Sequence, residues 1–111
     1  MPTAPGSFTW DSANRVTATF FIEDILHSFT ANINPSLPPF TSNDVVMTYN
    51  EPKDLTSTRS FTGKLGPINF KISLENDVIF EGKLNQPGIP TGVTLNGSGA
   101  WIETVSKAGP I

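Results

Sequence analysis

Three side chains in this sequence, Glu23, His27 and Arg59, have the chemistry that an acid–base catalyst needs. A carboxylate and an imidazole can exchange protons with a substrate, and a guanidinium can stabilise a negatively charged oxygen. His27 is the single histidine of the chain, and histidine is the side chain that most readily changes charge near neutral pH. If Glu23 and His27 share one face of a strand and Arg59 faces the same interior, they could form a site in the lumen of a small β-barrel enzyme of the cyclase or isomerase type.

The same three residues also have a purely structural interpretation. Glu23 and Arg59 can lie at strand ends, with Arg59 extending towards solvent, while His27 is held in the core by a backbone carbonyl. Alternation along a strand does not reveal which strands are neighbours. The sequence therefore leaves both interpretations open.

A second set of residues, Trp10, Tyr49, Asn50 and Trp101, suits ligand binding. A sugar needs a flat apolar ring under its C–H face and planar polar groups that hold its hydroxyls. The abundance of Thr, Ser and Asn predicts a polar but largely uncharged surface, which fits that chemistry. The leading prediction is a non-catalytic carbohydrate-binding module, lectin-like in its chemistry, although tryptophan also commonly packs in a core.

Metal and cofactor chemistry have little support in the sequence. The chain has one histidine and no cysteine, which excludes thiolate metal sites, a disulfide framework and a thiol nucleophile. Its acidic and amide residues lack the spacing of a calcium loop, and there is no glycine-rich phosphate loop. We expect neither a metal nor a cofactor. The net charge is −3 and the basic residues are scattered singly, so nucleic acid is not an expected partner.

Length and composition predict one domain. The chain has 111 residues and a mass of 12.0 kDa, close to the commonest domain size. No apolar run approaches the ~20 residues that cross a bilayer, and the first residues lack the pattern of a signal peptide. The absence of cysteine fits a reducing compartment such as the cytoplasm. We expect a single β domain over residues 1–111, in which the Pro/Gly/Ser-rich residues 1–7 form a flexible N-terminal arm.

The clearest structural element is a β-hairpin over residues 68–84. Apolar and polar residues alternate strictly in both arms, which predicts one buried and one solvated face. Residues 75–77, Glu-Asn-Asp, supply the turn. The phrase Phe-x-Gly-Lys-Leu occurs at residues 61–65 and 80–84, and its glycines are expected at bulges or at close approaches between strands.

Residues 22–33 are ambiguous in the sequence. Their apolar residues fit one helical stripe, but Ile25, His27, Phe29, Ala31 and Ile33 also fit one face of a strand. The strand is preferred because the segment is rich in Thr and Asn. A last hairpin is predicted around residues 96–99, Asn-Gly-Ser-Gly, because Asn-Gly is the strongest short hairpin signal.

Together these segments predict an all-β, antiparallel, single-domain β-sandwich or flattened β-barrel of about eight strands. An exposed edge strand would allow such a protein to form a homodimer. A third function, that of a structural or assembly subunit, would require a large flat apolar interface.

Overall fold

The computed structural model describes residues 2–22, 25–34, 39–85, 89 and 92–105. These residues form eight β-strands and one short 3₁₀ helix. The elements are β1 (Thr3–Ser12), β2 (Arg15–Ile22), β3 (Ile25–Asn34), β4 (Thr41–Thr48), η1 (Pro52–Asp54), β5 (Thr58–Leu65), β6 (Asn69–Leu74), β7 (Ile79–Lys83) and β8 (Val93–Val105). In this part of the chain, no helix has the length and apolar character needed to cross a membrane.

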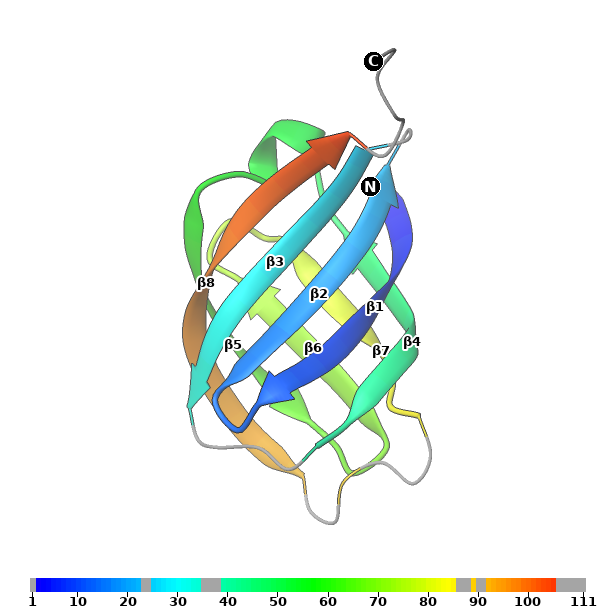
Figure 1. Ribbon diagram of the computed structural model, residues 1–111, viewed down its shortest axis with the longest axis vertical. Helices are drawn as coiled ribbons and strands as arrows, with labels where there is room; N and C mark the ends of the chain where they lie inside the picture. The colour runs from blue at the N-terminus through cyan, green and yellow to red at the C-terminus, as the bar shows by residue number, and fades with distance from the viewer. Residues whose placement is uncertain (1, 23–24, 35–38, 86–88, 90–91, 106–111) are drawn as a thin grey trace.

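The strands form a closed antiparallel barrel in the order β1-β2-β3-β8-β5-β6-β7-β4, and β4 pairs back with β1. Figure 1 shows β1, β2 and β3 running obliquely across one wall of the barrel, with β8 beside β3. The prediction of an all-β antiparallel fold is confirmed, and the architecture is a barrel. Each of these strands pairs on both sides, so the prediction of an exposed edge strand is wrong, and with it the edge-strand route to a homodimer.

Aromatic rings fill much of the barrel interior. The ring of Phe29 has its centroid 4.9 Å from that of Trp101, 5.9 Å from that of Phe61 and 5.8 Å from that of Phe80. Phe20 extends the cluster, with its centroid 5.0 Å from that of Phe80. These tilted and edge-to-face arrangements are the ones that aromatic pairs prefer. The cluster links strands that are far apart in the sequence.

The hairpin predicted over residues 68–84 is confirmed as β6 and β7, with Phe70 and Phe80 both buried. Asp77 has a φ of 68° in the turn, which an aspartate tolerates better than most residues. The glycines of the two repeats lie where strands approach closely. A Cβ on Gly63 would be 2.8 Å from the Cα of Ile72, and one on Gly82 would meet the backbone oxygen of Asp44.

The prediction of a flexible N-terminal arm over residues 1–7 is wrong from Thr3 onwards. Residues from Thr3 belong to β1, which closes the barrel between β2 and β4. Ala4 and Phe8 are buried, and a Cβ on Gly6, between them, would lie 2.8 Å from Cε1 of Phe20. The Pro/Gly/Ser composition obscured a period-two pattern of inward positions.

The hairpin predicted around residues 96–99 is also wrong. β8 runs without a turn from Val93 to Val105 and pairs with β3 on one side and β5 on the other. A Cβ on Gly97 would meet the backbone oxygen of Asn32 and lie 2.9 Å from Cζ of Phe61, and one on Gly99 would lie 2.7 Å from both the backbone oxygen of Thr30 and Cζ of Phe29. These glycines make room for the backbone of β3 as well as for aromatic rings.

The strand interpretation of residues 22–33 is confirmed from Ile25 onwards. β3 pairs with β2 and β8 over its length. His27, Phe29, Ala31 and Ile33 are buried and Ile25 is partly buried, so these residues line the predicted inner face.

Candidate functional site

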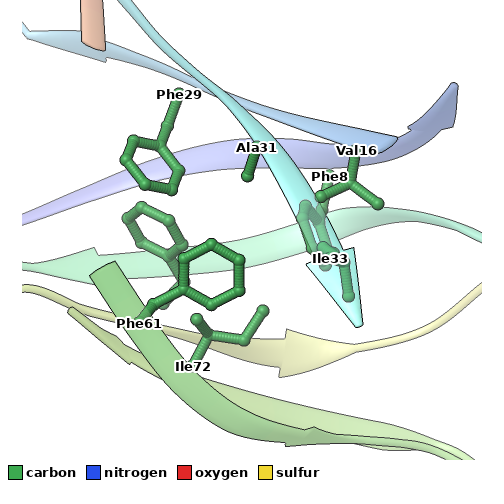
Figure 2. A pocket seen from close by; sticks show the side chains of 8 residues that line it. Phe8, Val16, Phe29, Ala31, Ile33, Phe61 and Ile72 are labelled. Atoms are coloured by element: carbon green, nitrogen blue, oxygen red, sulfur yellow. The ribbon is translucent and has the colours of Figure 1, made fainter. Parts of the chain in front are cut away.

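Among the described residues, little free space is found in the barrel interior. Its cavity has a volume of about 10 Å³ and is lined only by apolar side chains, which point towards one another from the surrounding strands (Figure 2). The lining residues are Phe8, Val16, Phe29, Ala31, Ile33, Phe61, Ile72 and Phe80. A cavity of this size is at the lower limit for a single water molecule, which would also need polar partners. It cannot hold a substrate.

The structure separates the members of the predicted acid–base set. His27 is buried on the inner side of β3, with 2% of its surface exposed, and the exposed Glu103 of β8 lies opposite it in the register. Arg59 is partly buried on β5, where its Nε donates a hydrogen bond of 3.2 Å to the backbone oxygen of Thr56. Glu23 lies outside the described residues. Nδ1 of His27 has no hydrogen-bond partner in the described structure.

The strand register gives the distance between His27 and Arg59. Arg59 pairs with Gly99, which in turn pairs with Ala31, four residues along β3 from His27. This offset corresponds to roughly 13 Å along the strand, and two strand spacings add about 10 Å across the sheet. The cavity lining contains neither residue. His27 and Arg59 therefore do not line a common cavity that is large enough for a substrate.

The predicted sugar-binding residues do not form one site either. Tyr49 and Trp101 are 5% and 8% exposed, because both lie at inward positions, so neither can offer a ring face to a sugar. Trp10 is partly buried against the core. Asn50 is exposed beyond β4.

Trp10 and Tyr49 lie near opposite ends of β1. The backbone N–H of Tyr49 bonds the oxygen of Pro2, whereas Trp10 is eight residues further along the chain, or roughly 26 Å in an extended strand. These two side chains therefore cannot contact one small ligand together. The aromatic platform expected from the sequence is wrong for Tyr49 and Trp101 because of their burial.

The outer surface carries a shallow depression of about 330 Å³ over four adjacent strands, β2, β3, β8 and β5. Its lining is rich in hydroxyl and amide groups, with one guanidinium and one large aliphatic side chain. The lining residues are Arg15, Thr30, Asn32, Thr58, Ser98, Gly99, Ala100 and Ile102.

The cross-strand register explains why the surface is hollow at this position. Ala100 on β8 pairs with Thr30 on β3 and with Thr58 on β5, so a single methyl group stands between two longer side chains. In the neighbouring row of outward-facing residues, Asn32 pairs with both Arg15 and Ser98. The pairing of the strands thus places these outward-facing side chains in two parallel rows across the sheet, with the short side chain of Ala100 in one of them.

Arg15 is the charged member of this lining. The ion pair found among the described residues joins Lys53 and Glu51, at 3.1 Å, and does not involve Arg15. Asp11, on the neighbouring strand β1, accepts a hydrogen bond of 2.5 Å from the hydroxyl of Thr17. The guanidinium of Arg15 is therefore exposed and has no carboxylate within ion-pair distance in the described structure.

Other kinds of site have weaker support. In the described ranges, no three His, Asp or Glu side chains gather in a way that could hold a metal ion. The apolar side chains of Phe21, Val46, Ile68 and Ile102 are exposed on the outside of the barrel. The assembly function predicted from the sequence stays a prediction, which sizing in solution would test.

Comparison of the chain with protein-family models, with curated proteins and with solved structures returned no match. The surface geometry is therefore the main guide to function. The depression is hard to recognise in the sequence, because residues 96–99 have the composition of a turn. A usable signal was present in Ala100, a small residue at an outward position between polar strands.

Proposed function

We propose that this protein is a non-catalytic binding module whose ligand is a carbohydrate, bound in the outer depression over β2, β3, β8 and β5. The observation that supports this proposal is the contrast in available space. The interior cavity measures about 10 Å³ and is apolar, whereas the outer depression measures about 330 Å³ and combines hydroxyl, amide and guanidinium groups with apolar surface.

The lining offers the groups that sugar hydroxyls need. The hydroxyls of Thr30, Thr58 and Ser98 can each donate and accept a hydrogen bond, and the Asn32 amide provides both functions in one plane. Ile102, which is 57% exposed, offers an aliphatic surface for the C–H groups of a pyranose. The site is shallow and has no aromatic platform, so we expect a dissociation constant of about 1 mM for a monosaccharide.

Backbone-amide NMR titration with a panel of neutral and acidic sugars tests this function. We expect the amide resonances of residues 30–32 and 98–102 to shift together as the ligand is added. An Ala100→Ile substitution should fill the hollow and weaken binding at least about fivefold, while the β-branched side chain suits a strand. Ser73→Ile on β6, at an exposed position outside the depression, is the matched control and should bind normally.

If no sugar in the panel shifts these resonances, or if Ala100→Ile binds as tightly as the unmodified protein, the outer depression is not a carbohydrate site.

A further inference from the structure

We infer that the carbohydrate is an acidic one, and that Arg15 binds its anionic group. This inference rests on the proposed function, since it concerns the same outer depression. A uronic acid carboxylate and a sulfate ester share the relevant chemistry, which is a pair of oxygens that a guanidinium can hold through two parallel N–H donors.

The charge distribution around the depression supports an anionic ligand. The lining residues other than Arg15 are neutral, although the whole chain has a net charge of −3. Asp11 bonds Thr17 and makes no ion pair with Arg15. The guanidinium therefore keeps its donors available, with the Asn32 amide beside it in the same cross-strand row. A carboxylate or sulfate group of the ligand would accept hydrogen bonds from these donors and neutralise the charge of Arg15.

The opposite end of the depression has a different character. Ile102 pairs with Ser28, four residues along β3 from Asn32, the partner of Arg15. The anion-binding end and the aliphatic end are therefore roughly 13 Å apart along the strand. That distance exceeds the width of one sugar ring. The site thus suits a short oligosaccharide with its acidic residue at Arg15 and the C–H face of another residue against Ile102.

The test compares methyl glucuronide, glucose 6-sulfate, neutral methyl glucoside and acetate by NMR titration at low salt. We expect the two acidic sugars to bind about tenfold more tightly than methyl glucoside, because a charge-assisted bidentate pair adds affinity. Arg15→Gln should abolish the roughly tenfold preference for the acidic sugars over methyl glucoside. Lys71→Gln on β6 removes a positive charge outside the depression and should change neither affinity.

The outcomes separate this inference from the function on which it depends. Equal binding of neutral and acidic sugars, unchanged in Arg15→Gln, would overturn the acidic ligand and leave the carbohydrate function standing. Failure of every sugar to bind would overturn both. If acetate bound as tightly as methyl glucuronide, the site would be a simple anion site, and the inference would be wrong.

Discussion

The inner and outer faces of β3 and β8 differ in both packing and chemistry. The inner face carries His27, Phe29, Ala31 and Trp101, which pack with almost no free volume. The outer faces carry small hydroxyl and amide side chains and a hollow. Along each strand, every second side chain therefore packs in the core, and the side chains between them lie on the outer surface. The ligand binding that we propose therefore uses the outer face, where the described residues leave a hollow.

The inner face is not entirely apolar. Nδ1 of His27 and Nε1 of Trp101 are both buried without a hydrogen-bond partner in the part of the chain that the structure describes. The two residues are diagonal neighbours, because His27 pairs with Glu103 and Trp101 pairs with Phe29. An unsatisfied buried polar atom costs about 1–3 kcal/mol, so surrounding apolar contacts must offset it. The aromatic packing therefore determines the stability of this face.

The largest expected effect comes from removing the central aromatic ring. Phe29→Ala should lower the free energy of unfolding by about 3–5 kcal/mol, because three neighbouring rings lose a partner and a cavity remains. Thr30→Val, at the next residue but on the outer face, should change it by less than ~0.5 kcal/mol. Chemical denaturation of both variants measures the difference. Similar losses in the two variants would remove the distinction between the faces.

A smaller loss is expected where β8 passes the aromatic rings. Gly97→Ala places a methyl group against the backbone oxygen of Asn32 and 2.9 Å from Cζ of Phe61, and we expect a loss of about 1–3 kcal/mol from overpacking. Ser98→Ala, on the outer face beside it, is the control and should be nearly neutral. Thermal and urea unfolding would show both effects. A Gly97→Ala variant as stable as the parent would contradict the close packing.

The smallest expected effect has the opposite sign. His27→Leu keeps a similar volume and removes the buried unpartnered nitrogen, so we expect the free energy of unfolding to rise by up to about 1 kcal/mol. Urea unfolding at neutral pH measures the change. A loss of more than ~1 kcal/mol would mean that the imidazole makes a stabilising hydrogen bond with a residue outside the described ranges.

Much of the fold could be predicted from period-two patterns. The alternation around Phe70 and Phe80 and along residues 27–33 correctly gave the strands and their inner faces. It failed at Gly6 and Gly97, because a glycine has no side chain to mark an inward position. Local turn propensity suggests an arm and a hairpin at these positions, whereas both segments pair with a neighbouring strand on each side.

The candidate site was less predictable than the fold. Burial of His27 was expected, but the positions of Trp101 and Arg59 depend on which strands become neighbours. The pairing of β8 with both β3 and β5 brings Thr30, Ala100 and Thr58 into one row. That arrangement joins three segments that are distant in the sequence, and no local pattern encodes it.

The position of β8 between β3 and β5 has a consequence for folding during synthesis. Until residues 93–105 have left the ribosome, β3 and β5 each lack a partner on one side, and the sheet stays open. Such pairing is non-local and slow to form, and unpaired edges promote aggregation. We therefore expect the nascent chain to be prone to aggregation until residues 93–105 have emerged and paired with both strands.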